Sequence, residues 1–354
     1  MGDLLEAAYP EIGKRLPKLA IADLPTPVTR HRLSLNRGSI EVAIKHDEAT
    51  NLLYGGNKVR KLEFLLRRAR DRGARRVATF GAAGSNHALA TAIHAIELGL
   101  DCTCFLSHQK ATPQVARTLN MHHRLGTEIF RWGRGVDQVA LFRNHLQGRR
   151  TWVIPLGGTC WLGAVGFINA GLELARQIAD GVVEQPDRIY IACGTTGSAA
   201  GLALGIAAAG LDSTVHAIQV ADNPFASERK MHKLMQKTRF ILNNMDSSFA
   251  AKNYERKVVW RDEFLAGGYA RVDEATSAAV KLAKDQLELS LETTYTGKAM
   301  AAMLHDIVAS DYDDARCLFW NTYNARPLPV SAAKPARLGN IPADFERYFE
   351  ARLA

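Results

Sequence analysis

The sequence lacks the features that identify membrane, secreted and zinc-binding proteins. No run reaches the roughly 18 consecutive apolar residues that a membrane-spanning helix needs. The five cysteines are odd in number and lack paired zinc-site spacing, which favours reduced thiols over a disulfide framework. The opening MGDLLEAAYPEIGKRLPKLA carries acidic residues early and has no apolar signal core. We therefore expect a cytoplasmic protein without a metal site and without membrane association.

Two nucleotide-binding motifs are also missing. The chain has neither the GxxxxGK[ST] spacing of triphosphate loops nor the GxGxxG spacing of dinucleotide-binding folds. Lysine and arginine number 45 against 36 acidic residues, which gives a formal net charge of +9. The basic residues concentrate between Lys58 and Arg76 without interleaved aromatics, unlike a single-strand nucleic-acid platform. An anionic cofactor or substrate, or a solvated basic surface, fits this charge better than nucleic acid.

Strand-like and helix-like segments alternate along the chain. Its 354 residues, 47% of them hydrophobic, suffice for two packed domains. Alternation in IEVAIK (40–45) and short apolar runs in RRVATFG, LDCTCFLS, DRIYIAC and CLFWNTYN predict strands. In LDCTCFLS, Cys102 and Cys104 fall on one face of the strand as small core side chains. Helical segments follow most of these strands, one of them ending near Leu146. The pattern predicts an α/β fold with parallel sheets covered by helices.

The first of these helices carries many basic side chains. Apolar residues recur at helical spacing from Val59 to Ala69, and Gly73 ends the pattern. The basic residues fall between the apolar ones, so we expect most of them on or beside the solvent face. This expectation covers Arg60, Lys61, Arg67, Arg68 and Arg70.

Lys58 follows GGN at the first turn of this helix. The positive end of the helix dipole and partial burial both disfavour an ammonium ion, which lowers the pKa and frees a nucleophilic amine. A lysine that forms a Schiff base needs such surroundings. On position alone, an ordinary exposed lysine is the simpler interpretation.

Two further strand-to-helix junctions offer groups that bind anions. Backbone N–H groups and hydroxyls in CGTTGSAAG (193–201) suit a phosphate, although a tight turn explains the glycines equally well. In GAAGSNHALA, Ser85, Asn86 and His87 offer donors for a carboxylate, and the alternative is that Ser85 or Asn86 only caps the helix.

Taken together, these motifs resemble the pyridoxal-phosphate (PLP) enzymes of the tryptophan-synthase-β-like fold, fold type II. The group that the chain is most similar to contains 1-aminocyclopropane-1-carboxylate deaminase and D-cysteine desulfhydrase. GGNKVRKLEFLL, GSNHA, GTTGSAAGLALG, GGYARVDEAT and YTGKAMAAM occur in that family's order between about residues 24 and 324. The resemblance implies a homodimer of subunits with two domains, each a mostly parallel twisted sheet flanked by helices. The large PLP domain would comprise residues 1–61 and 173–354, and the small domain residues 62–172.

The resemblance also implies the roles of the cofactor-binding residues. Lys58, preceded by Asn57, would hold the cofactor covalently, and Asn86 would bind the phenolic oxygen of its ring. Thr296 or Thr322 would be a neutral partner of the pyridine nitrogen. The phosphate would rest on Gly194, Thr195, Thr196, Gly197 and Ser198.

The same resemblance implies a substrate site for a small amino acid. Ser85, Asn86 and His87 would hold the substrate carboxylate, and Tyr269 and Tyr295 would flank the substrate. The catalytic residues would be Lys58, Ser85, Tyr269 and Tyr295.

Two details favour a desulfhydrase over a deaminase within this group. The deaminases carry glutamine where this chain has His87 and glutamate where it has Thr296. We therefore expect α,β-elimination that yields a 2-oxo acid and ammonia, with sulfide when the substrate is D-cysteine. Cyclopropane ring opening is an alternative. A PLP-binding homologue with an altered substrate or without turnover is another, because Cys160, Trp161, Tyr323 and Asn324 replace smaller or more polar family residues.

Overall fold

A computed structural model describes residues 4–35, 38–133, 136, 140–141, 150–249, 251–310, 314–324, 326 and 338–350. It contains two compact units. Unit 1 comprises residues 1–64 and 159–326, and unit 2 comprises residues 65–158 and 327–354. The domain limits expected from the sequence, 1–61 with 173–354 and 62–172, stay a prediction. Most of the helix expected to end near Leu146 lies outside the described residues.

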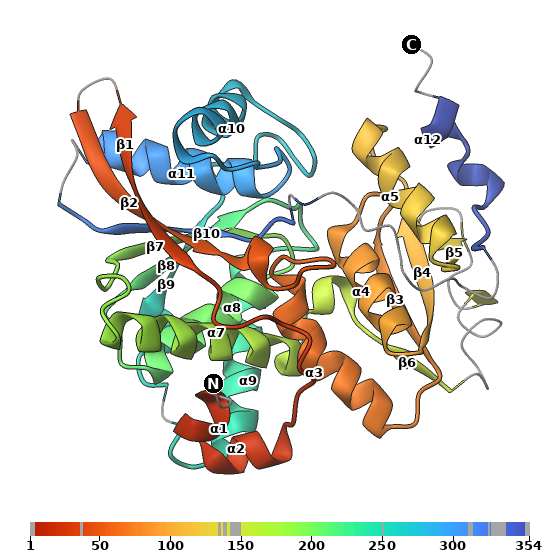
Figure 1. Cartoon of the computed structure of the whole chain (residues 1–354), viewed down its shortest axis with the longest axis horizontal. Coiled ribbons are helices and arrows are strands. Elements are labelled where there is room, and N and C mark those ends of the chain that lie inside the picture. Colours follow the sequence, from red (N-terminus) through yellow and green to blue (C-terminus); the bar gives the residue numbers. More distant parts are fainter. Residues whose placement is uncertain are drawn as a thin grey trace. The chain divides into compact units, whose positions relative to one another are not determined.

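Unit 1 is built on a six-stranded sheet in the order β1-β2-β10-β7-β8-β9 (Figure 1). Its strands are β1 (Val28–Leu35), β2 (Gly38–His46), β10 (Cys317–Asn321), β7 (Arg188–Cys193), β8 (Thr214–Gln219) and β9 (Val258–Arg261). Only the β1–β2 hairpin is antiparallel, and the other neighbours are parallel. In the middle of the sheet, Phe319 lies opposite Ile44 on one side and Tyr190 on the other. The near-continuous burial of β7 and β10 is typical of strands covered on both faces.

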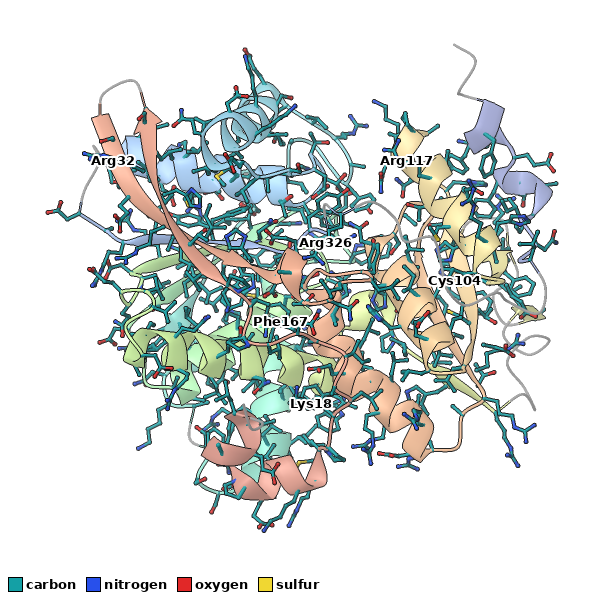
Figure 2. All side chains as sticks on the ribbon, in the orientation of Figure 1. Lys18, Arg32, Cys104, Arg117, Phe167 and Arg326 are labelled. Carbon is teal, nitrogen blue, oxygen red and sulfur yellow. The ribbon has the colours of Figure 1, made fainter. Side chains whose placement is uncertain are left out.

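Helices cover both faces of this sheet (Figure 1). One face carries α10 (Glu274–Leu287) and α11 (Thr296–Ala309), and the other carries α7 (Trp161–Ala179), α8 (Gly197–Ala208) and α9 (Glu228–Met245). The short α1 (Leu4–Ala8) and α2 (Pro10–Arg15) also belong to unit 1, in which α3 (Lys58–Asp71) begins. Phe167 of α7 packs against β10, where its ring lies 6.0 Å from that of Trp320 (Figure 2).

The small residues of α7 and α8 bring these two helices into backbone contact. A Cβ atom on Gly171 would lie 2.7 Å from the carbonyl carbon of Gly205, and one on Gly201 would lie 2.3 Å from the carbonyl oxygen of Ala164. Neither position has room for a side chain. Helix α8 is buried from Gly197 to Ile206, and it is fixed with its first turn at the end of β7.

Unit 2 contains a parallel four-stranded sheet in the order β5-β4-β3-β6. Its elements are β3 (Arg76–Ala82), α4 (Asn86–Glu97), β4 (Asp101–Ser107), α5 (Pro113–Arg124), β5 (Glu128–Arg131), β6 (Thr151–Val153) and α12 (Arg347–Glu350). Cys102 and Cys104 are buried on β4 with their sulfurs 3.8 Å apart, which confirms them as core residues (Figure 2). The predicted α/β fold with two mostly parallel sheets is confirmed.

Three further expectations concerned membrane helices, metal sites and the segment 226–260. Within the described residues, no helix is long and apolar enough to cross a membrane. No group of three or more histidine, cysteine or acidic side chains in the described part of the chain could hold a metal ion. The lysine-rich segment 226–260 contains α9 and most of β9, so it is helical in part and also supplies the edge of the sheet.

Candidate functional site

The backbone before α3 turns sharply and rests on the segment that follows β10. Gly56 has a φ of +97°, which favours glycine, and a Cβ there would lie 3.0 Å from the carbonyl oxygen of Thr322. The N–H of Asn57 donates to that same oxygen at 3.2 Å. The N–H of Gly55 donates to the Asn324 side chain at 3.2 Å. Asn324 therefore supports the turn that leads into α3.

The amine of Lys58 lies at the start of a hydrogen-bonded chain of side chains. Lys58 Nζ donates to Asn57 Oδ1 at 3.0 Å, and Asn57 Nδ2 donates to Ser198 Oγ at 3.0 Å. Burial lowers the pKa of Lys58 to about 8, although the nearby Glu292 and Cys193 oppose this shift. Unit 1 thus brings Lys58 to the predicted phosphate loop and holds its amine ready to lose a proton near neutral pH.

The prediction that Arg60 and Lys61 lie on or beside the solvent face is wrong. Both residues are only 1% exposed. Arg60 Nε lies 3.0 Å from both carboxylate oxygens of Asp47, and Arg60 Nη1 donates to Glu173 at 2.9 Å. Lys45 Nζ donates to Glu173 as well, at 2.5 Å. These four residues form a buried ion cluster, and its members come from segments too far apart in sequence for helical spacing to reveal.

Lys61 is the functional candidate that the sequence did not reveal. A Cβ on Gly197 would lie 2.8 Å from Lys61 Nζ and 2.9 Å from Thr159 Oγ1, so the amine reaches the start of α8. Burial lowers the pKa of Lys61 well below its usual value, and Lys58 lowers it further. An anion bound beside it would reverse both effects. The sequence could have pointed to Lys61, because it lies about one helical turn after the proposed reactive Lys58.

The loop between β7 and α8 has the shape of an anion cradle. Thr196 has a φ of +71°, in the left-handed region, and its side chain makes no capping hydrogen bond in the described structure. Its backbone turns so that α8 begins at Gly197 with its N-terminal N–H groups beside Lys61. Thr195 Oγ1 lies 2.6 Å from Thr159 Oγ1, which fixes one wall of the loop.

The two tyrosines that the resemblance singled out are in contact. The hydroxyl oxygens of Tyr269 and Tyr295 lie 2.7 Å apart, and the rings meet edge to face at 74°. Burial raises the pKa of both phenols. The Tyr295 ring also lies beside the loop, because a Cβ on Gly194 would be 3.2 Å from its Cε1. Unit 1 therefore places the tyrosine pair next to the predicted phosphate loop.

Glu292 shapes the turn that carries Tyr295. Its carboxylate accepts hydrogen bonds from the backbone N–H groups of Thr294, Tyr295 and Thr296 at 2.7 to 3.1 Å. The hydroxyl of Thr296 donates to the same carboxylate at 3.1 Å. Burial raises the pKa of Glu292. Thr296 is thus engaged with Glu292, whereas Thr322 remains the other candidate neutral partner.

Ser85, Asn86 and His87 belong to unit 2. Ser85 Oγ accepts a hydrogen bond from the N–H of Ala88 at 3.2 Å, so it caps α4. His87 is buried, with Nε2 3.0 Å from the hydroxyl of Thr79. The structure shows that Ser85 caps α4, and whether this is its only role is not tested. Ligand roles for these three residues stay a prediction.

The residues of unit 1 fit a cofactor that carries an aldehyde and a phosphate. A partly buried amine with a pKa near 8 suits covalent attachment to an aldehyde. A helix N-terminus with adjacent hydroxyls and a second buried amine suits a phosphate. The chain Lys58–Asn57–Ser198 joins the two ends of such a site.

Comparisons with known proteins show the family of this chain. A family described as "Pyridoxal-phosphate dependent enzyme" matches residues 20–322. The chain is 33% identical over 327 residues to a D-cysteine desulfhydrase from Klebsiella pneumoniae subsp. pneumoniae, covering 89% of this chain and 96% of that protein. A solved "ACC deaminase homologue" superposes with a TM-score of 0.69 at 26% identity, covering 92% and 96% of the two chains.

A more distant solved structure shows the same fold. A threonine deaminase from T.th. gives a TM-score of 0.59 at 18% identity, covering 92% of this chain and 98% of its own. The predicted fold class, that of the fold type II enzymes, is confirmed by these likenesses.

Proposed function

Because the chain belongs to the pyridoxal-phosphate-dependent enzyme family, we propose that it is a lyase that performs α,β-elimination on a small amino acid. With D-cysteine and one water, the products are a 2-oxo acid, ammonia and sulfide. The observation that supports this most strongly is the position of the Lys58 amine, whose neighbour Asn57 bonds Ser198 of the phosphate loop. The 33% identical desulfhydrase relative supports the choice of D-cysteine.

The cofactor is proposed to bind to the residues that unit 1 brings together. Lys58 holds it covalently, and the phosphate rests on residues 194–198 with Lys61 as an added cation. Thr322 is the better candidate partner of the pyridine nitrogen, because the hydroxyl of Thr296 already donates to Glu292. The roles of Ser85, Asn86 and His87 stay as the resemblance predicted them.

The bound cofactor supplies the electron sink that stabilises negative charge at the substrate α carbon. Once the substrate amine has taken its place on the cofactor, the freed amine of Lys58, with a pKa of about 8, would be the base that accepts the α proton. The phenols of Tyr269 and Tyr295 have raised pKa values, so they keep their protons at neutral pH. Either can donate one through the 2.7 Å pair to the departing sulfur. All three groups are partly buried, which favours proton transfer over exchange with water.

A substrate panel tests this function. We expect Lys58→Ala to lose the yellow colour of the lysine-bound cofactor and the release of 2-oxo acid from D-cysteine. Lys284→Ala, at an exposed lysine on α10, is the matched control and should retain both. The panel contains D- and L-amino acids with a β leaving group. A colour unchanged in Lys58→Ala would contradict the assignment of this lysine.

Ring opening of 1-aminocyclopropane-1-carboxylate is the second candidate function, supported by the 26% identical deaminase homologue. Thr296 stands where the deaminases carry glutamate, so we expect little activity on this substrate in the same panel. If the enzyme turns over 1-aminocyclopropane-1-carboxylate faster than D-cysteine, the order of the two proposals is reversed.

The homodimer rests on the family resemblance and the cytoplasmic location on the sequence features described above, and both remain proposals. Sedimentation velocity of the holoenzyme measures the first, and a dimer is the expected species.

A further inference from the structure

The turn that carries Tyr269 has an uncommon backbone. Four of its residues have positive φ angles, namely Ala266 (55°), Gly267 (76°), Gly268 (142°) and Ala270 (57°). For alanine, each such conformation costs on the order of 1 kcal/mol or more. A turn of this kind persists only when its surroundings hold it.

Lys298 adds side-chain contacts to the two backbone bonds of this turn, from Gly268 N–H to Leu265 O at 3.2 Å and from Arg271 N–H to Gly268 O at 3.3 Å. Its Nζ donates to the carbonyl oxygens of Leu265 and Gly268 at 2.6 and 3.0 Å. The residue is fully buried. The two bonds span the positive-φ residues that lead to Tyr269. A neutral side chain of the same length would leave both carbonyls without this donor, and such losses are costly in a buried position.

Lys298 also belongs to the helix that begins beside the other tyrosine. Helix α11 starts at Thr296, and Tyr295 is its N-cap residue. Lys298 lies three residues after Tyr295, so its side chain connects the start of α11 to the turn of Tyr269. One side chain therefore links the two segments that carry the tyrosines.

Asp222 makes a weaker contact with the same turn. Its Oδ2 accepts the N–H of Tyr269 at 3.1 Å, and a Cβ on Gly268 would lie 3.1 Å from its Oδ1. Asp222 is exposed, so solvent screens its charge and we expect it to contribute less than Lys298. Asp222 lies after β8, whereas Lys298 lies in α11, so the two residues contact the turn from different elements.

We propose that Lys298 is a positioning residue that holds Tyr269 within hydrogen-bonding distance of Tyr295, and that Asp222 assists it. The catalytic value of this position rests on the proposed function, in which the tyrosine pair protonates the leaving group. The effect of Lys298 on the environment of the two phenols can be measured independently of turnover.

The experiment compares the holoenzyme of Lys298→Met with that of Lys298→Arg and wild type. Lys284→Met is the matched control at an exposed lysine. Each protein is labelled with 3-fluorotyrosine, and the ¹⁹F signals of the pair are assigned with Tyr269→Phe and Tyr295→Phe. Trypsin cleavage after Arg271, which is exposed beside the turn, is followed by mass spectrometry.

In Lys298→Met we expect the signals of Tyr269 and Tyr295 to shift while those of the other seven tyrosines stay in place. Cleavage after Arg271 should become faster. The kcat for D-cysteine should fall about a hundredfold with little change in KM, since a misplaced catalytic group costs this much. Lys298→Arg, which keeps donors, should recover part of each change. These results would support the proposal.

Unshifted signals of the pair in folded Lys298→Met would overturn it. So would equal shifts of all nine tyrosine signals, because these would indicate a global effect. If Lys298→Met does not fold, Asp222→Leu serves as the second variant. It should shift the Tyr269 signal more than the signals outside the pair, and its failure to do so would also count against the proposal. A wild-type protein without D-cysteine turnover would contradict the proposed function alone, because the ¹⁹F result would stand.

Discussion

Lys58 and Lys61 are three residues apart and have different neighbours, and Lys58 is partly buried whereas Lys61 is buried. Lys58 donates to Asn57, whereas Lys61 reaches the N-terminus of α8 beside Gly197. In the proposed function, Lys58 therefore holds the cofactor covalently, and Lys61 binds its phosphate electrostatically. We predict that Lys61→Met weakens PLP binding by about tenfold to a hundredfold, the value of one charge-assisted hydrogen bond.

Titration of the apoenzyme with PLP, followed by visible absorbance, measures this change. Lys281→Met, at an exposed lysine on α10, is the control and should bind PLP as wild type does. Equal affinity of Lys61→Met and wild type would remove Lys61 from the proposed phosphate site.

The buried ion cluster makes a prediction about stability. Glu173 accepts from Arg60 and Lys45, and these two cations lower its pKa to about 2 despite burial. Glu173→Gln leaves two buried cations with less compensation, and we expect a loss of about 3–5 kcal/mol in the free energy of unfolding at pH 7. Urea unfolding measures it, with exposed Glu97→Gln as the control.

The same prediction has a defined pH dependence. A carboxylate with a lowered folded-state pKa stabilises above its unfolded pKa of about 4.5, and this contribution is lost as the pH falls toward 2. The difference between wild type and Glu173→Gln should therefore shrink between these two pH values. A difference that stays constant over this range would show that packing, rather than charge, accounts for the loss.

For single residues, the sequence pointed to Lys58 but not to the burial of Arg60 and Lys61. The order of the motifs, rather than the position of Lys58 after GGN, singled out this lysine, and its role stays a prediction. Burial of Arg60 and Lys61 could not be predicted, because the spacing of α3 shows only which residues share a face. The buried partners that decide this burial come from residues 47 and 173.

Among the elements, α7 and α8 form a contact that leaves no room for an added side chain. A Cβ on Gly205 would lie 2.5 Å from the carbonyl oxygen of Ile168. Alanine gains about 1 kcal/mol over glycine in helix propensity, whereas overpacking costs about 1–3 kcal/mol. We predict that Gly205→Ala lowers the free energy of unfolding despite its higher helix propensity.

Chemical denaturation checks the sign of this change. Gly38→Ala is the control, because a Cβ there meets no described atom within 4 Å. An increase in stability for Gly205→Ala would mean that the two helices can separate without cost.

Most helices and strands could be predicted from the sequence, but the order of the strands within the sheet could not. Periodicity located α3 and the apolar strands, since burial on one or both faces leaves a direct pattern. It gave no information on why β10 should lie between β2 and β7, because that order depends on contacts between distant segments. The turn 265–270 was equally hidden, since two of its positive φ angles belong to alanine.

For the whole molecule, cofactor binding and folding are linked. The proposed site joins residues 57–61 to residues 194–198 and 322, so the cofactor binds only when these distant segments are assembled. We predict that removing PLP lowers the melting temperature and that adding it back restores the value. A ligand at 100 to 1,000 times its Kd stabilises by about 3–4 kcal/mol.

Thermal unfolding of holo and apo protein measures this difference, and Lys58→Ala should show a smaller response to added PLP. An identical melting temperature with and without cofactor would contradict the assembly of the site from these segments. The family and fold were predictable at this scale, because five motifs in a fixed order are far more specific than any one of them.

The placement of β10 has a consequence for how the chain is made. Strand β2, which leads to Lys58, finds its parallel neighbour only in residues 317–321. A nascent chain leaving the ribosome therefore carries this edge of β2 without its parallel neighbour until residues 317–321 have been made, whereas the described strands of unit 2 end at residue 153. The sheet that supports the lysine can close only after β10 has emerged.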